Sequence, residues 1–380
     1  MLRYLTGGES HGPALTGIIE GLPAGLYVDI EIINRDLAQR QMGYGRGERM
    51  AIEADRVRIL SGMRGGVTLG SPISFLIENN DYENWQDYMN PVAESKNDKR
   101  VTAPRPGHAD LTGALKYRFD DARNVLERAS ARETATRVVV GSICRQLLER
   151  FGVQVYFHVV NIGGIKVQVE NKVEQNMLEV LKSPLFMRDK AAEQRAIELI
   201  DAAKAGGESV GGIFEIVITG VPAGLGSYVH WDRKLDAKLA FALQSIQAIK
   251  GVEFGCGFEC ADLPGSAVHD EIFYSAARGY SRNTNNAGGI EGGMSNGESI
   301  IIRCAMKPIP TLKNPLRSVD IIDHSAIVAN SERSDICAVP AAAVVGAAVA
   351  ATVVAEEFLR VFGGDSIEEM EARWRKSQLI

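Results

Sequence analysis

The sequence predicts one domain of mixed α+β type, and three observations lead to that expectation. Segments with strand-like and helix-like patterns alternate irregularly along the 380 residues. No Pro/Ser-rich linker divides the chain, so we expect residues 1–380 to form a single unit. The apolar share of 45% is sufficient for a large core, and the charged share of 24% is that of a folded protein.

A repeated turn indicates an internal duplication. Residues 15–20 and 212–218 have the pattern of strands, and each leads into a nearly identical turn, GLPAGL at 21–26 and GVPAGL at 220–225. A polar-capped helix is expected after each turn, over residues 34–42 and 232–249. The same strand, turn and helix at two places predicts that half of the fold is duplicated.

Further helices follow from capping signals and apolar periodicity. Ser130 and Glu133 have the spacing of a capping box, which predicts a helix that begins there and stops at Gly152. Residues 172–182 and 188–205 fit two more amphipathic helices. Residues 336–355 are uncharged over the length of a membrane span, but they are mostly alanine and glycine and Pro340 interrupts them. We therefore expect a buried helix of the core or of a subunit interface.

Composition limits the classes of function. The net charge of −6 argues against general nucleic-acid binding. The first residues lack a charged region followed by a long apolar one, so no secretory signal is expected. Five scattered cysteines without a C-x-x-C pair indicate neither a disulfide framework nor a thiolate zinc site. These features favour a soluble protein of the reducing cytoplasm.

An arginine-only cluster suggests a local anion site. Seven arginines lie between Arg35 and Arg64, and no lysine occurs before Lys96. Guanidinium groups bind carboxylates and phosphates bidentately, which suits such a site. The alternative is a solvated face, balanced by the acidic residues of the same segment.

Two glycine-rich loops contain candidate proton-transfer histidines. His11 lies in GGESHG (7–12), and His108 lies in PRPGHAD (104–110), whose Asp110 can cap the following helix. Histidine exchanges a proton near neutral pH, but a lone histidine is more often structural. We apply the structural interpretation to the four histidines outside such loops, His158, His230, His269 and His324.

Three later segments could bind a ligand. Residues 278–294, rich in glycine and amides, suit either a cradle for a planar ring and its phosphate or a flexible surface loop. Residues 306–311, MKPIPT, could form a phosphate site, whereas Arg333 and Asp335 could bind a ligand or simply pair. P-loop, H-E-x-x-H and Rossmann signatures are missing. The residues alone thus indicate an enzyme acting on a small, anionic and phosphorylated substrate.

Seven blocks of the sequence resemble, in order and spacing, the signature blocks of the chorismate synthase family. They run from Thr6 to about Ala355 and are GESHGPALTGIIEGLPAG, RQMGYGRGERM, RPGHADLTGALKYRFDDARNVLERASARETATRVVVG, KGVEFGCGF, TNNAGGIEGGMSNGE, MKPIPTL and ERSDICAVPAA. The resemblance implies a β-α-β sandwich of antiparallel sheets around helices, usually assembled as a homotetramer. It also implies conversion of 5-enolpyruvylshikimate 3-phosphate to chorismate, with a requirement for reduced FMN but no net redox change.

The implied reaction is a 1,4-anti elimination that loses the 3-phosphate and a hydrogen from C6. The reduced flavin would donate electron density transiently as phosphate departs. By the resemblance, His11 would protonate or stabilise the leaving phosphate, and His108 would protonate the reduced flavin near N1 and C2=O. Asp335 would act through flavin N5 in removing the C6 hydrogen. These roles match the physical needs of the reaction.

The resemblance also implies two sets of binding residues. The substrate set is Ser10, Arg40, Arg46, Arg49, Arg105, Arg132 and Arg333. The flavin set is Arg128, Ala129, Ser130, Gln247, Ala248, Gly292, Lys307, Pro308, Ile309, Pro310, Thr311 and Arg333. No metal is expected, and either NADPH or an external flavin reductase would supply electrons. Ala347 stands where many family members carry glutamate, a change that concerns packing more than catalysis.

Two other functions stay open at this point. One is a flavin oxidoreductase with a hydride-accepting substrate, which would oxidise its flavin stoichiometrically. The other is a non-catalytic sensor of phosphorylated metabolites, which would tolerate the loss of both loop histidines.

Overall fold

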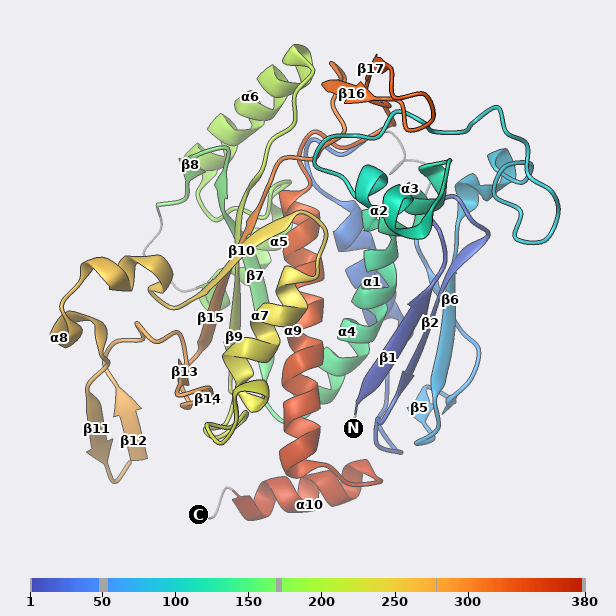
Figure 1. Cartoon of the computed structure of the whole chain (residues 1–380). Helices are drawn as coiled ribbons and strands as arrows, with labels where there is room; N and C mark the ends of the chain where they lie inside the picture. Colours follow the sequence, from blue (N-terminus) through green and yellow to red (C-terminus); the bar gives the residue numbers. More distant parts are fainter. Residues whose placement is uncertain (1, 48–53, 169–172, 278, 378–380) are drawn as a thin grey trace.

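Two antiparallel sheets lie on either side of a layer of helices in the computed structural model, which describes residues 2–47, 54–168, 173–277 and 279–377 (Figure 1). The first sheet has the order β1-β2-β6-β3, with β1 (Arg3–Gly7), β2 (Ala14–Glu20), β6 (Ile73–Glu78) and β3 (Val57–Ile59). The second has the order β10-β15-β9-β7-β8, with β10 (Ile249–Phe254), β15 (Ile300–Met306), β9 (Gly212–Thr219), β7 (Gln154–Ile162) and β8 (Ile165–Lys166).

Four helices fill the space between the sheets. They are α1 (Ile30–Gln41), α4 (Thr134–Glu149), α7 (Leu235–Gln244) and α9 (Val339–Phe362). α9 packs against the other three helices and against β7 and β9, while α4 contacts β1, β2 and β6. The predicted mixed α+β class and the sandwich of antiparallel sheets around helices are therefore confirmed.

The two halves of the chain repeat one topology. The first half runs β1, β2, α1, β3, β6, α4, and the second half runs β7, β9, α7, β10, β15, α9. In both halves the four strands stand in the same sheet order and pair antiparallel throughout. The structure thus supports the internal duplication that the repeated turn predicts.

The repeated turns also share their hydrogen bonds. In the first turn, the hydroxyl of Thr68 donates to the carbonyl of Pro23 at 2.6 Å and accepts from the amide of Leu26 at 3.0 Å. In the second turn Ser295 replaces Thr68, and the matching distances are 2.6 and 2.9 Å. A buried hydroxyl that satisfies both backbone groups explains why the two turns keep one shape.

The uncharged segment predicted at 336–355 forms most of α9. Among the described residues, α9 is the one helix long and apolar enough to cross a membrane, and 83% of its most apolar stretch is buried inside the protein. Small residues let α4 approach it closely, since a Cβ at Gly141 would lie 2.3 Å from the carbonyl oxygen of Ala348. The segment is a core helix, as expected from its alanine and glycine content.

Two predicted helices after the repeated turns have different ends. α1 begins at Ile30 rather than 34, because Asp29 caps it by accepting from the amide of Glu31 at 2.9 Å. α7 is shorter than 232–249, because a 3-10 turn at Trp231–Arg233 precedes it and β10 follows it.

The predicted capping box is only half present. Ser130 accepts from the amide of Arg132 at 3.3 Å and begins the 3-10 turn Ala131–Glu133, after which α4 starts at Thr134. The side chain of Glu133 does not reach back to Ser130 but binds Arg137 and Gln247. α4 ends at Glu149, close to the predicted stop at Gly152, whose φ is 82°.

The helices predicted at 172–182 and 188–205 correspond to α5 (Met177–Lys182) and α6 (Lys190–Gly206), with residue 172 outside the described residues. Asp189 caps α6 by accepting from two amides, and Gly207 ends it with a φ of 73°. The remaining elements are α2 (Asp110–Tyr117), α3 (Arg123–Ala129), α8 (Gly265–Val268), α10 (Ile367–Ser377), β4 (Met63–Arg64), β5 (Val67–Thr68), β11 (Ile272–Ser275), β12 (Gly279–Arg282), β13 (Ile290–Glu291), β14 (Met294–Ser295), β16 (Arg317–Val319) and β17 (Ala326–Val328).

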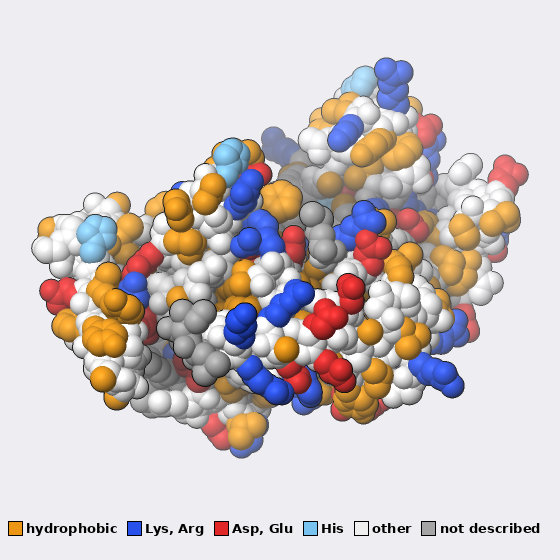
Figure 2. Space-filling model, turned by 90° about the horizontal axis from the view of Figure 1, so that it is seen from below, with side chains coloured by type: hydrophobic (Ala, Val, Ile, Leu, Met, Phe, Trp, Pro, Cys, Tyr) orange, Lys and Arg blue, Asp and Glu red, His pale blue; other side chains and the backbone are white. Residues whose placement is uncertain are grey.

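Two short helices and a hairpin lie together at one end of the helical layer (Figure 1). Figure 1 shows α2, α3 and the β16–β17 hairpin at the top, and α10 at the opposite end. Figure 2 views the molecule from the α10 side, where basic and acidic side chains are interspersed with small hydrophobic groups. That face offers no uniformly basic surface.

The close crossing of α4 and α9 predicts a measurable cost for a single methyl group. Gly141→Ala places a Cβ against the backbone of Ala348, and we expect a loss of about 1 to 3 kcal/mol in the free energy of unfolding. Denaturant unfolding at fixed protein concentration measures it. Gly206→Ala is the matched control, because this helical glycine has open space around it and alanine should be neutral or slightly stabilising there. Equal stability of the two variants would contradict the prediction.

Candidate active site

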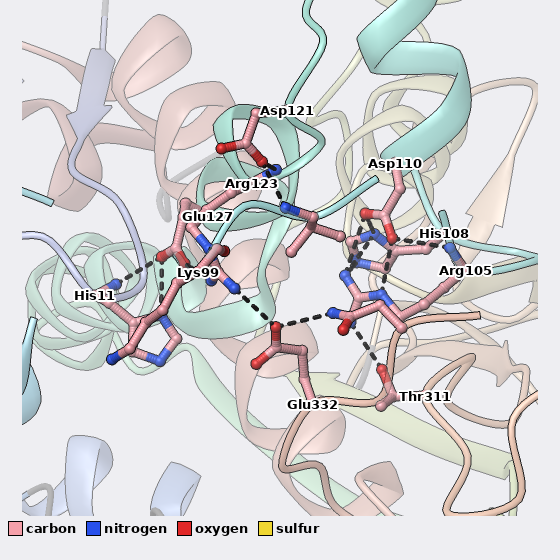
Figure 3. A network of polar contacts seen from close by, with 12 residues as sticks. His11, Lys99, Arg105, His108, Asp110, Asp121, Arg123, Glu127, Thr311 and Glu332 are labelled. Carbon is pink, nitrogen blue, oxygen red and sulfur yellow. Dashed lines mark hydrogen bonds and ion pairs between the residues drawn. The ribbon is translucent and has the colours of Figure 1, made fainter. Parts of the chain in front are cut away.

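His11 lies between a buried carboxylate and an indole ring. Its Nδ1 is 2.9 Å from each carboxylate oxygen of Glu127, and its backbone amide donates to Oε2 at 2.8 Å (Figure 3). Its ring stacks on Trp85 with a centroid separation of 4.1 Å and an interplanar angle of 28°. The side chain of Asp81 lies on the other edge, with Oδ2 4.0 Å from Nε2. The loop at 7–12 therefore holds His11 rigidly beside α3.

His108 has a carboxylate partner as well. Its Nδ1 is 2.5 Å from Oδ1 of Asp110, and the guanidinium of Arg105 donates to Oδ2 of the same carboxylate at 2.8 Å (Figure 3). Arg105 also donates to Thr311 Oγ1 at 2.8 Å. Asp110 does not cap α2 as predicted, because its side chain turns back to the amide and side chain of Arg105.

The pKa of Asp110 lies well below its ordinary value. Burial alone would raise this pKa, but the hydrogen bonds from His108 and Arg105 and the charge of Arg105 outweigh it. Asp110 is therefore a carboxylate at neutral pH, and since a carboxylate only accepts, Nδ1 of His108 carries the hydrogen.

Two of the predicted substrate arginines are held by internal contacts. Arg132 donates to Asp55 at 2.6 and 2.7 Å and to Asn79 at 2.9 Å, and its side chain is 3% exposed. Arg40 donates to Thr134 Oγ1 at 3.0 Å and lies 3.5 Å from Asp55. Burial lowers the pKa of Arg40 to about 10, although the charge of Asp55 opposes that change. These contacts hold the side chains of Arg40 and Arg132 in place at the edge of the site.

Arg46, Arg333 and Asp335 connect the arginine cluster to the segment before α9. Arg46 forms an ion pair with Asp335 at 2.8 Å, and the amide of Gly47 donates to the same carboxylate at 2.7 Å. Arg333 binds Asp81 at 3.2 Å, which brings it close to His11. Arg333 and Asp335 thus do not pair with each other but reach different partners. Arg49 lies outside the described residues.

Most predicted flavin residues border this region. Gln247 donates through Nε2 to Glu133 at 2.8 Å, and the carbonyl of Ala248 accepts from the amide of Lys307 at 3.0 Å. Ala248 has a φ of 67°, an uncommon value for a residue with a Cβ. The ammonium of Lys307 donates to the carbonyl of Gly107, next to His108. Residues 247–248 and 307–311 therefore meet the His108 loop.

The other flavin residues are divided between two places. Arg128 ends α3 with Ala129, and its side chain donates to the carbonyls of Thr6 and Gly8 at 3.1 and 3.0 Å. Ser130 follows at the start of the 3-10 turn, and Ser10 is buried beside α3. Gly292, however, lies in the β13–β14 hairpin, which Figure 1 shows far from α2 and α3. One chain does not bring Gly292 to the other predicted residues.

The glycine-rich segment at 278–294 is held by a carboxylate that precedes it in the chain. Asp270 accepts from the hydroxyl of Thr284 at 2.5 Å and from the amides of Asn286 and Ala287 at 2.8 and 2.9 Å. Arg278 lies outside the described residues. Within this chain the segment joins β12 to β15 and is not part of the histidine network.

Sequence reasoning missed the acidic members of the site. Glu127 and Asp81 were not singled out, and Glu133 was named only for a capping box, although each contacts a predicted residue. The spacing of Arg123 and Glu127, one helical turn apart, was the available signal for a buried ion pair. Arg123 joins the His11 group to Glu332 (Figure 3). Two residues further along the chain, Ser334 donates to the carbonyl of Thr311, which binds Arg105 beside His108.

Comparison with known proteins identifies the family of this chain. The family model described as Chorismate synthase matches residues 2–359. The chain belongs to the chorismate synthase family. A chorismate synthase from Alkaliphilus metalliredigens is 62% identical over 99% of both chains, and one from Geobacter metallireducens is 56% identical over 98% of both. A solved chorismate synthase structure has a TM-score of 0.79 at 41% identity, covering 99% of this chain and 97% of that one.

The predicted family, fold and activity are confirmed by these comparisons. Chorismate synthases are lyases that remove phosphate from 5-enolpyruvylshikimate 3-phosphate, in the biosynthesis of aromatic amino acids. The two rival functions, a flavin oxidoreductase and a metabolite sensor, are thereby set aside.

Asp110 predicts a specific pH dependence of stability. Because the pKa of Asp110 is lower in the folded protein than in the unfolded chain, its carboxylate stabilises the fold at pH values above the ordinary carboxyl pKa, near 4. This stabilisation is lost as the pH falls below 4 toward the pKa of the folded protein. Asp110→Asn should lower the free energy of unfolding by about 3 kcal/mol at neutral pH, and the gap to the unsubstituted protein should narrow below pH 4. Unfolding measured from pH 7 to pH 3 tests this. Asp232→Asn is the control, because its His-x-Asp pair with His230 is exposed.

Proposed function

We propose that this chain forms chorismate by a 1,4-anti elimination of phosphate in which His11, His108 and Asp335 act on the reactants and reduced FMN is the cofactor. The observation that supports the proposal is the pairing of each histidine with a buried carboxylate inside one arginine-rich polar network. Such pairing orients a histidine for proton transfer, and the surrounding guanidinium groups favour anionic ligands.

His11 is the proposed donor to the leaving phosphate. Its Nδ1 faces Glu127, so a proton would pass through Nε2, on the side of Asp81 and Arg333. Arg333 is 52% exposed at its side chain and is therefore the cation of this group best able to meet a phosphate oxygen. A proton donor and a guanidinium at one point stabilise the charge that develops as the C–O bond breaks.

His108 and Asp335 are the proposed groups on the cofactor side. Asp110 occupies Nδ1 of His108, so His108 would hold its transferable proton at Nε2. Asp335 is held in place by Arg46 and the amide of Gly47, which suits a group that assists removal of the hydrogen from C6. Arg46 and Arg40 would meet the substrate anions, with Ser10, Arg49, Arg105, Arg132 and Arg333 completing the proposed substrate set.

The residues present fit a flavin. Nε2 of Gln247 binds Glu133, while its Oε1 is buried and has no hydrogen-bond partner among the described residues. An acceptor of this kind matches the N–H of an isoalloxazine ring. The backbone at 128–130, Ala248 and residues 307–311 would hold the rest of the cofactor, and another subunit of the proposed tetramer would supply Gly292. When bound, reduced FMN supplies the electron density that helps phosphate depart without net redox change.

The remaining features of the proposal concern the whole enzyme. We infer a cytoplasmic homotetramer whose flavin is reduced by NADPH or by an external flavin reductase. Exposed aromatic side chains on the β11–β12 arm, Tyr274 and Tyr280, are compatible with an assembly surface. The five cysteines are free, as suits a reducing compartment.

Loss of either proposed histidine should abolish most turnover. We expect His11→Ala and His108→Ala each to reduce phosphate release on the order of 10²-fold, because each removes a positioned proton donor. The assay is anaerobic phosphate release from 5-enolpyruvylshikimate 3-phosphate with dithionite-reduced FMN. His230→Ala, which breaks an exposed His-x-Asp pair of the same spacing, should leave turnover unchanged. Wild-type rates in either of the first two variants would remove that histidine from the mechanism.

The source of electrons is tested with the same substrate. If the enzyme reduces its own flavin, NADPH and oxidised FMN under anaerobic conditions should support phosphate release by the purified protein. The number of NADPH molecules oxidised should stay far below the number of phosphates released, since the elimination is redox-neutral. Equal amounts of oxidised NADPH and released phosphate would contradict the proposed chemistry.

A further inference from the structure

We propose that Glu127 is a positioning residue that holds the imidazole of His11 in its Nδ1–H form, so that Nε2 is the atom that exchanges the proton. This inference deepens the proposed function and rests on the role given there to His11. It concerns a residue that makes its contacts through His11 and not with the substrate.

Glu127 makes two hydrogen bonds with His11 and one with the neighbouring Ser10. One carboxylate accepts from the ring at 2.9 Å and from the backbone amide of His11 at 2.8 Å. The amide of Ser10 donates to the main-chain carbonyl of Glu127 at 3.0 Å. Because both the backbone and the ring of His11 are bound to one residue of α3, the rotation of its side chain is fixed.

The charge state of Glu127 determines which ring nitrogen carries the hydrogen. Burial by itself would raise the pKa of Glu127, yet this pKa lies below its ordinary value because the hydrogen bonds and charge of His11 and the charge of Arg123 stabilise the carboxylate. Arg123 donates to Oε1 at 3.0 Å. An ionised carboxylate can only accept, so Nδ1 of His11 must donate.

The face of the ring is fixed separately. Trp85 stacks on His11, and the ammonium of Lys99 lies 3.8 Å from the centroid of the indole. Oδ2 of Asp81 lies 4.0 Å from Nε2, beyond hydrogen-bonding distance, and is itself bound by Arg333. With Nδ1 and one face occupied, Nε2 is the nitrogen presented to a ligand oxygen.

The consequence is a division of labour between Glu127 and the arginines. In the proposed function, substrate affinity depends on the arginines of the substrate set. The guanidinium that binds Glu127 belongs to Arg123, which is outside that set. Proton donation depends on the orientation and charge of His11. Loss of the carboxylate should therefore lower kcat much more than it changes KM.

Glu127→Gln tests this, because it keeps the size of the side chain and removes its charge. In the full-length enzyme labelled with 15N-histidine, the signals of His11 are identified by their loss in a His11→Asn variant. At a pH where the ring is neutral, the unsubstituted enzyme should show protonated Nδ1, and Glu127→Gln should show a mixture of the two tautomers. We expect kcat to fall on the order of 10²-fold with KM little changed, and Glu127→Asp to recover part of the loss.

Glu357→Gln is the matched control. Glu357 is also a buried carboxylate, 1% exposed at its side chain, but it lies in α9 and binds Lys238 at 2.6 Å and Arg360 at 2.8 Å. This variant should keep both the tautomer of His11 and kcat.

Two outcomes would overturn the assignment. One is an unchanged tautomer and kcat in Glu127→Gln. The other is a lower thermal midpoint with a normal kcat, which would mean that Glu127 serves only stability. Failure of the proposed function has a different signature, namely full activity of His11→Ala while the tautomer of His11 still responds to Glu127→Gln.

Discussion

Buried acidic side chains at one end of the helical layer determine the arrangement of the candidate site. Glu127, Asp110 and Asp55 are each fully enclosed at the side chain, and each is bound by at least one guanidinium. Burying a charge costs free energy unless the charge is paired and hydrogen-bonded, so removing one partner of such a pair should strongly lower the free energy of unfolding. The histidines and arginines of the site consequently occupy positions that the carboxylates impose.

This arrangement separates two kinds of basic residue. Arg105, Arg123 and Arg132 are used mainly to neutralise buried acids, whereas Arg333 keeps much of its side chain in solvent. A basic cluster in the sequence therefore does not translate directly into a cluster of ligand contacts. Some of these arginines form ion pairs inside the protein and hold the side chains of the site in place.

Much of the fold could be predicted from the sequence, because local signals were strong. The turn repeats, the uncharged segment of α9 and the Asp189 and Gly207 ends of α6 are each defined by a few neighbouring residues. The starts of α1 at Ile30 and of α4 at Thr134 were misplaced, at residue 34 and at Ser130, because these polar residues also offer local caps. Helix propensity does not determine which of these residues caps the helix, because tertiary packing overrides it.

The candidate site was predictable only in part, for a physical reason. His11 and His108 stand in loops whose glycines are visible in the sequence, and the loop of His108 also contains its partner Asp110. The partner of His11 is not local. Glu127 is far along the chain from His11, and Asp81 is far from Arg333. Contacts of that kind are created by the sandwich itself, so they become apparent only when the two sheets and the helices between them are assembled.

The duplicated topology has a consequence for the origin of the fold. Each half supplies one sheet and two helices, and the helices of one half are covered on one side by those of the other. A polypeptide of half this length would expose that side of its helix pair to water. Two such half-chains would cover each other by packing their helix pairs together, as the two halves of this chain do.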